Sequence, residues 1–154
     1  MVSVTESQVQ TPVVALVGNP NAGKSSLFNS LTGGRQKIGN YPGVTVEKVT
    51  GHYSFGDELV QCVDIPGLYS LSPVSADEGV ATTAIEAGAD LLVYVVDAAN
   101  LERNLFFFTQ LCDTGLPMIV AVTMTDVLER EGKSLDVLKL EQHLKARVVS
   151  VIAH

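Results

Sequence analysis

Short apolar runs recur along this chain at intervals, and each ends at polar or small residues. The runs cover residues 12–18, 90–100, 116–123 and 147–153 and are rich in Val, Leu and Ile. A continuous apolar run of this length, bounded by turn-forming residues, is typical of a parallel strand that is buried on both faces. The pattern therefore predicts four central strands.

Segments with the apolar spacing of amphipathic helices lie between these runs. They begin at about residue 24, after Ser75, at residue 101 and at residue 135. In the third of them, four large apolar side chains fall on one helical face, and Gly115 gives a stop signal. Strands that alternate with helices predict a mostly parallel sheet with helices on both faces.

Residues 45–55 and 59–67 are two further strand-like segments, joined by a Gly-Asp-Glu turn at 56–58. This pattern predicts a hairpin, which adds one antiparallel strand to the sheet. Residues 33–45 are rich in glycine and have no periodicity, so they are expected to form a long mobile loop. The sequence thus predicts a three-layer α/β fold with about six strands.

The 154 residues fit a single domain with its own core. We expect a flexible N-terminal arm at residues 1–12 and one domain at 13–154. No helix is predicted after the last strand, so we expect the chain to be a fragment of a longer protein. It contains no signal peptide and no apolar run long enough to span a bilayer, and the fragment is expected to be soluble.

The composition of the chain excludes some structural classes and some classes of binding partner. Hydrophobic residues make up 46% of the chain and charged residues 18%, which excludes disorder of the whole chain. Ten basic and 17 acidic residues give a net charge of −7, and no basic cluster exists. Direct nucleic-acid binding is therefore not expected. Cys62 and Cys112 lack metal-ligand spacing and are predicted to be reduced, buried thiols.

The stretch "GNPNAGKS", residues 18–25, fits the phosphate-loop motif and stands between a predicted strand and a predicted helix. Gly18 and Gly23 let the backbone N–H groups converge on phosphate oxygens. Lys24 is expected to contact the β- and γ-phosphates, and the Ser25 hydroxyl to bind Mg²⁺. The nucleotide-binding residues predicted here are Gly18, Asn19, Pro20, Asn21, Ala22, Gly23, Lys24, Ser25 and Ser26.

Two further candidates follow along the chain. Asp64 ends a predicted strand and is suited to hold Mg²⁺ through its water shell, while the Gly67 N–H can meet a γ-phosphate. Thr45 lies in the glycine-rich loop and has two interpretations. It either closes over Mg²⁺ and the γ-phosphate or simply begins the next strand.

The stretch "VTMTD", residues 122–126, stands where a GTPase recognises its base. Asp126 can accept hydrogen bonds from guanine N1–H and the exocyclic amine, whereas adenine would leave the carboxylate unpaired. Thr123 stands where Asn is usual, and the lost hydrogen bond costs about 0.5–1.5 kcal/mol. Met124 can pack its thioether on the base. In the alternative interpretation, Asp126 only caps a helix and base choice is loose.

These motifs, with "GNYPGVTVEK" and "DIPGLYSLSP", resemble the bacterial ferrous iron transport protein B family. The resemblance runs from about Val13 to Ala153 and concerns the cytosolic N-terminal GTPase (G) domain of that family. It implies GTP and GDP as ligands, Mg²⁺ as cofactor and hydrolysis of GTP to GDP and phosphate. It also implies helical and transmembrane transporter domains as partners, at the cytoplasmic face of the bacterial inner membrane, and leaves an oligomeric assembly open.

The resemblance also implies roles for single residues. Leu68 occupies the position of the Gln that orients water in Ras-like GTPases, so slow turnover is expected. Asn21 implies activation by K⁺, bound by its side-chain oxygen and by carbonyls around Gly39 to Tyr41. By propensity alone, Asn21 could instead cap the loop's own backbone. The Ala153 N–H is expected to meet guanine O6. The catalytic set implied by the resemblance is Asn21, Lys24, Thr45 and Gly67.

Two other functions stay open at this point. The domain could be a nucleotide-sensing module that hydrolyses too slowly to act as a catalyst, which the Leu68 position favours. It could also be a GTPase of the same superfamily that associates with the ribosome or tRNA. The acidic composition and the "YPGVTVE" stretch, residues 41–47, argue against this second alternative.

Overall fold

A computed structural model describes residues 10–71, 76–86 and 88–152 of the chain. The strands are β1 (Val13–Gly18), β2 (Gln36–Asn40), β3 (Glu47–Phe55), β4 (Glu58–Asp64), β5 (Leu91–Asp97), β6 (Met118–Thr123) and β7 (Arg147–Ser150). The helices are α1 (Lys24–Thr32), α2 (Ala76–Glu86), α3 (Leu101–Asp113), α4 (Thr125–Arg130) and α5 (Val137–Leu144), with a short 3₁₀ helix, η1 (Ala98–Asn100). Of the expected N-terminal arm, residues 1–9 lie outside the described part.

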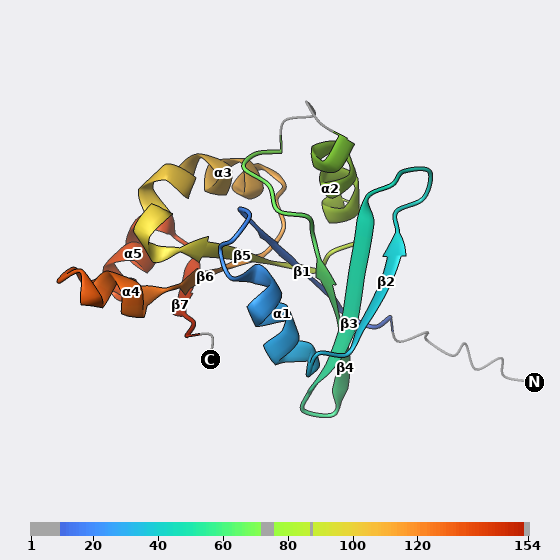
Figure 1. The fold of residues 1–154 in the computed structure, drawn as a ribbon, viewed down its shortest axis with the longest axis horizontal. Coiled ribbons are helices and arrows are strands. Elements are labelled where there is room, and N and C mark those ends of the chain that lie inside the picture. Colours follow the sequence, from blue (N-terminus) through green and yellow to red (C-terminus); the bar gives the residue numbers. More distant parts are fainter. Residues whose placement is uncertain (1–9, 72–75, 87, 153–154) are drawn as a thin grey trace, which may run out of the picture.

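The seven strands form a single sheet in the order β2-β3-β4-β1-β5-β6-β7 (Figure 1). β3 pairs antiparallel with β2 and with β4, and every other neighbouring pair is parallel. The mostly parallel α/β fold with one antiparallel strand is confirmed. Because β1, β4 and β6 run in the same direction, the segments that follow them emerge at one edge of the sheet.

Besides η1, whose residues were placed in the predicted strand 90–100, two elements were not predicted from the sequence. Residues 33–45 are not all loop, because residues 36–40 form β2 along the free edge of β3 and make the sheet seven-stranded rather than six-stranded. Helix α4 directly follows β6. All five side chains of β2 are exposed, and α4 buries none of its own. Neither element therefore has the apolar periodicity from which burial is predicted.

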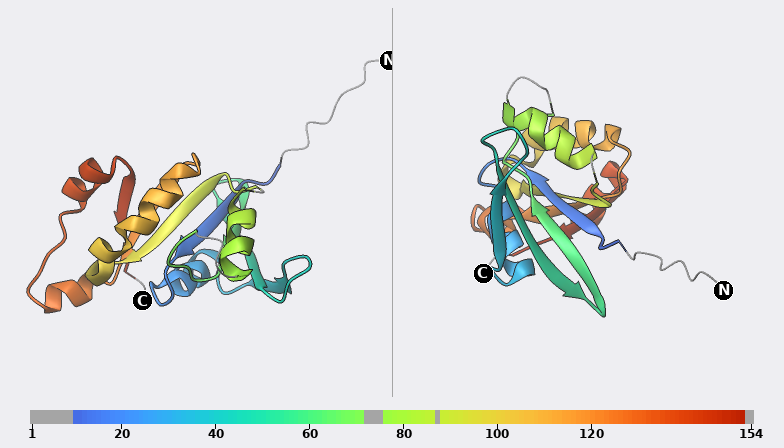
Figure 2. Two further views of the ribbon diagram at one scale, coloured as in Figure 1. Left: turned by 90° about the horizontal axis from the view of Figure 1, so that it is seen from above. Right: turned by 90° about the vertical axis from the view of Figure 1, so that its right-hand side faces the viewer.

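Helices cover both faces of the sheet. In Figure 1, α1 lies below the central strands and α2 and α3 lie above them, and Figure 2 shows the same layers from two further sides. On the α1 face, Phe28 packs against Val14, Leu16, Val60 and Cys62. Among the described residues, no helix is long and apolar enough to cross a membrane.

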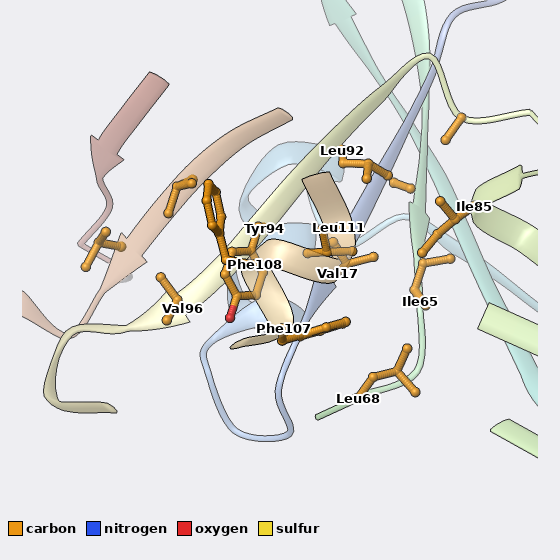
Figure 3. Close-up of a cluster of buried hydrophobic side chains, with 14 of the residues drawn as sticks. Val17, Ile65, Leu68, Ile85, Leu92, Tyr94, Val96, Phe107, Phe108 and Leu111 are labelled. Atoms are coloured by element: carbon orange, nitrogen blue, oxygen red, sulfur yellow. The ribbon is translucent and has the colours of Figure 1, made fainter. Parts of the chain in front are cut away.

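The larger core lies on the opposite face, between the sheet and helices α2 and α3 (Figure 3). Tyr94 of β5 meets the Phe107 ring edge-to-face, with 5.6 Å between ring centroids. Both cysteines are free thiols. Cys62 is buried as predicted, and burial raises the pKa of its thiol to about 12. The prediction that Cys112 is buried was wrong, because this free thiol falls on an exposed part of α3.

Candidate nucleotide-binding site

The phosphate loop (residues 18–25) connects the end of β1 to the start of α1, as the motif requires. Asn21 and Gly23 both have left-handed backbone conformations, with φ of 64° and 93°. This turn brings the backbone of residues 24–26 to the start of α1, where the first N–H groups of a helix have no intrahelical acceptor. Such a turn with a helix dipole behind it is suited to bind phosphate oxygens.

The structure gathers residues from distant parts of the sequence around the phosphate loop. A cavity of about 520 Å³ is lined by Gly67, by Met124 and by seven residues of positions 19–26. A second cavity, of about 430 Å³, is lined by Thr45 and Asp64, among others. Lys24 lines both cavities. The predicted phosphate and metal residues thus lie around the same two cavities, and Met124 is the predicted base residue that joins them.

Lys24 and Asp64 form a buried ion pair. The Lys24 ammonium donates to the Asp64 carboxylate at 2.6 Å between Nζ and Oδ1, and the two side chains are 10% and 13% exposed. With Thr45 on the same cavity and Ser25 at the start of α1, the site offers the oxygen ligands that Mg²⁺ prefers. The donor set therefore fits Mg²⁺ together with a phosphate. Thr45 does not begin a strand, since β3 starts at Glu47.

The segment that follows β4 packs directly on the phosphate loop. The Leu68 N–H donates to the Gly18 carbonyl at 2.9 Å. A Cβ on Gly67 would come within 2.9–3.0 Å of Pro20, so only glycine allows this approach. Leu68 is 3% exposed, belongs to the larger core cluster (Figure 3) and does not line the cavity. It supplies no polar group that could orient water.

Thr123 is placed beneath the phosphate loop rather than in the cavity. Its side chain is buried, and its hydroxyl donates to the Ala22 carbonyl at 2.5 Å. Thr123 is not among the residues that line the cavity beside Met124. The hydroxyl thus links the end of β6 to the phosphate loop, and Thr123 contributes no contact to the cavity.

We expect Thr123→Val to destabilise the phosphate loop. Val has nearly the same shape but cannot donate, so the buried Ala22 carbonyl loses a partner, which costs about 1–3 kcal/mol. Urea unfolding measures the loss of stability, and pyrophosphate and GDP should lose affinity by the same factor. Thr123→Ser keeps the hydroxyl and should recover most of both. A loss confined to GDP would show that Thr123 acts on the base instead.

Asp126 lies in the first turn of α4, and Met124 is the residue before this helix. Met124 has φ of 58°, and no side chain caps the helix, so the capping interpretation of Asp126 is wrong. The Asp126 carboxylate is 44% exposed and accepts from Arg130 Nη2 at 3.2 Å. It remains accessible to a base that packs on Met124. Ala153 lies outside the described residues.

The residues predicted to bind K⁺ are not brought together. Asn21 is exposed and makes no side-chain hydrogen bond within the described part of the chain, which argues against the loop-capping interpretation. Gly39 belongs to β2 and pairs with Lys48 of β3. The Tyr41 carbonyl accepts from the Val44 N–H at 3.3 Å. Strands β3 and β4 separate β2 from β1 in the sheet, and Asn21 lies in the loop that follows β1.

Sequence reasoning missed two supporting side chains. The Asn104 amide oxygen accepts a hydrogen bond from the Asn19 side chain, and the Tyr94 hydroxyl donates to the Asn104 backbone carbonyl at 2.8 Å. Asn104 is buried on α3 and so fixes one end of the phosphate loop to the core. A polar residue on the apolar face of the predicted helix was the available signal. The spacing of Arg130, four residues after Asp126, was also not used, although side chains at this spacing on a helix are neighbours.

The sheet order, the phosphate loop and the Asp64–Gly67 segment define the class of the protein: it has the fold of the P-loop GTPases. A family model described as ferrous iron transport protein B matches residues 12–154. The chain therefore belongs to the ferrous iron transport protein B family. The Fe(2+) transporter FeoB of Legionella pneumophila is 44% identical over 90% of this chain, and that of Salmonella typhimurium 47% over 91%. The chain spans 19% of the length of each of these relatives.

Solved structures agree with this assignment. A mutant of S. thermophilus NFeoB bound to GDP superimposes with a TM-score of 0.88 at 46% identity, covering 93% of this chain and 56% of that one. The G domain of the T. maritima FeoB iron transporter gives a TM-score of 0.86 at 37% identity, covering 94% of this chain and 89% of that one. These matches confirm the family and the G-domain fold that the sequence motifs predicted.

Proposed function

We propose that residues 13–154 bind GTP and hydrolyse it slowly, as the regulatory G domain of a bacterial Fe²⁺ transporter. The observation that carries the proposal is the shared position of Lys24 on two adjoining cavities, one lined by Met124 and the other by Asp64 and Thr45. In this proposal the base lies beside Met124, the phosphates beside Lys24, and the metal beside Asp64 and Thr45. Helical and transmembrane transporter domains at the cytoplasmic face of the inner membrane are the proposed partners.

The residues of the two cavities have distinct roles in this proposal. The phosphate loop N–H groups bind the phosphates, and Lys24 leaves Asp64 to contact the β- and γ-phosphates. Asp64, Ser25 and Thr45 hold Mg²⁺. When bound, this ion neutralises charge that develops on the phosphate oxygens. Met124 packs on guanine and Asp126 accepts its two N–H donors, so that adenine is rejected.

Slow turnover follows from Leu68. Because its side chain is buried, no polar side chain from this position orients the attacking water. The Gly67 N–H, next to Pro20 on the loop, is left to position the γ-phosphate. The domain must then rely on positioning and on charge stabilisation, which dominate phosphoryl transfer.

Potassium would add charge stabilisation where an arginine finger acts in other GTPases. In our proposal the Asn21 side-chain oxygen and the carbonyls of Gly39 and Tyr41 hold K⁺. Residues 39–41 must then leave their present hydrogen bonds with β3 and with Val44 and move toward the phosphate loop. The β2 edge strand buries no side chain, so little packing opposes this movement.

The test compares GTP hydrolysis in K⁺ and Na⁺ buffers for the unmodified chain and for Asn21→Gly. Glycine keeps the left-handed conformation at φ of 64° without strain and removes only the side-chain oxygen. We expect hydrolysis to rise steeply in K⁺ for the unmodified chain, and Asn21→Gly to lose most of that rise with GDP affinity nearly unchanged. Asn21→Ala serves as the strained control.

Equal rates in K⁺ and Na⁺ would remove potassium from the proposal. GDP binding without measurable turnover in either buffer would favour the second candidate, a nucleotide-sensing module. The buried position of Leu68 is the observation that keeps this candidate open. The matches to transporter relatives support the family over a ribosome- or tRNA-associated GTPase.

A further inference from the structure

A large apolar cavity lies on the other side of Thr45 and Asp64, between α2 and the sheet. It has a volume of about 730 Å³. Its walls include Val13, Val63 and Ile65 from the sheet side and Val80 and Ala84 from α2. A volume within the range of about 300–1,000 Å³ and a mostly apolar lining are typical of small-molecule sites.

Two hydrogen-bond donors stand at one side of this cavity. Lys48 is the one charged side chain among the described residues that line it, and its ammonium lies 5.5 Å from the centroid of the Tyr41 ring. Lys48 takes part in no ion pair within the described part of the chain. Tyr41 also lines the cavity, and its hydroxyl is buried without a hydrogen-bond partner among the described residues. Burial of a hydroxyl costs free energy unless an acceptor takes a hydrogen bond from it.

We propose that this cavity binds a free carboxylic acid with a long apolar chain. The chain would occupy the apolar part between α2 and β4, and the carboxylate would pair with Lys48 and accept from the Tyr41 hydroxyl. An acid supplies both the charge and the acceptor that these donors lack, whereas an alcohol supplies no charge and an amine the wrong one. The net charge of −7 repels a bilayer surface that carries many anionic head groups more than it repels a single carboxylate, which favours the free acid over a membrane lipid.

Such a ligand would also act on the proposed nucleotide site, and this second step rests on the proposed function. The cavity is lined by Tyr41 and Val44, which precede Thr45, and by α2, which follows the Gly67 segment. A carboxylate held by Lys48 and Tyr41 would keep residues 39–41 beside β3. We expect it to oppose the movement toward Asn21 and so to lower K⁺-stimulated hydrolysis.

Binding is tested on the nucleotide-free protein by displacement of the fluorescent apolar anion 8-anilino-1-naphthalenesulfonate. Decanoate, decanol and decylamine share one chain and differ only in the head group. We expect decanoate to displace the dye at about tenfold lower concentration than decanol, because only the carboxylate can form a charge-assisted hydrogen bond with Lys48. Decylamine should be the weakest of the three.

Two variants distinguish the contribution of the ligand's head group to binding from the contribution of the apolar cavity. Lys48→Met should abolish the preference for decanoate over decanol, while Lys37→Met, a matched change on the adjacent exposed strand β2, should leave it intact. Ala84→Phe should fill the cavity and weaken all three ligands at least tenfold, with folding checked by its circular dichroism melting curve. Equal displacement by decanoate and decanol, or an unchanged preference in Lys48→Met, would overturn the proposal.

Binding of the acid and its effect on GTP hydrolysis can be contradicted independently of each other. Decanoate binding by a protein that binds no nucleotide would support the cavity proposal and contradict the proposed function. Decanoate binding that leaves K⁺-stimulated hydrolysis unchanged would support the site and contradict its coupling to residues 39–41. Absence of displacement at decanoate concentrations below its micelle formation would contradict the cavity proposal and leave the proposed function intact.

Discussion

Replacement of Lys24 by Met should both destabilise the nucleotide-free domain and abolish nucleotide binding. Lys24 is the partner of Asp64 in a nearly buried pair at 2.6 Å. Removing one member leaves an uncompensated carboxylate, which costs about 3–5 kcal/mol. In the nucleotide complex that we propose, the same substitution removes the ammonium that contacts the β- and γ-phosphates.

The two effects are separable by a second substitution. In Lys24→Met/Asp64→Asn the unpaired charge is gone, so urea unfolding should show most of the lost stability recovered while GDP binding stays absent. Lys133→Met is a matched control, because the ion pair of Lys133 with Glu131 is exposed and should contribute no more than about 1 kcal/mol. A Lys24→Met protein as stable as this control would show that the pair is not maintained in solution.

Replacement of Asp126 by Asn should remove most of the preference for guanine. The carboxylate accepts two guanine N–H donors in our proposal, and hydrogen bonds to a charged group are worth about 1.5–3 kcal/mol each. The Asn amide would turn an N–H group toward one of these donors. We expect GDP affinity to fall at least about a hundredfold while ADP affinity changes little. Titration with fluorescent GDP and ADP, in K⁺ buffer with Mg²⁺, measures both.

Arg130→Gln is the control for this substitution. Arg130 lies 3.2 Å from Asp126 and its side chain is 78% exposed, so loss of the pair should alter GDP affinity by no more than a few-fold. Equal binding of GDP and ADP by the unmodified chain would mean that residues 122–126 do not select the base. The site would then be a phosphate-binding site without base preference.

The sequence alone predicted the parts of the fold that carry an apolar pattern or a motif. The buried strands β1, β5 and β6 appear as Val-rich runs, and helix α3 appears through its spaced Leu and Phe residues. The phosphate loop was recognisable because its glycines and lysine stand at fixed spacing between a strand and a helix. The family was recognisable from the same motifs, and the comparisons confirm it.

Other features depend on contacts between residues far apart in the sequence. β2 and α4 bury no side chain, so only the free edge of β3 and the end of β6 determine where they form. The link from Thr123 to Ala22 spans 101 positions, and the Lys24–Asp64 pair spans 40.

What the sequence by itself determined about this protein is therefore its fold class, its family and the residue types of its phosphate loop, because these follow from local spacing and burial. Tertiary structure alone decided that Thr123 supports the loop, that Lys24 neutralises Asp64, and that α2 leaves a cavity beside Lys48. The physical reason is that hydrogen bonds and ion pairs depend on positions in space to within a few tenths of an ångström, and the order of strands in the sheet sets those positions.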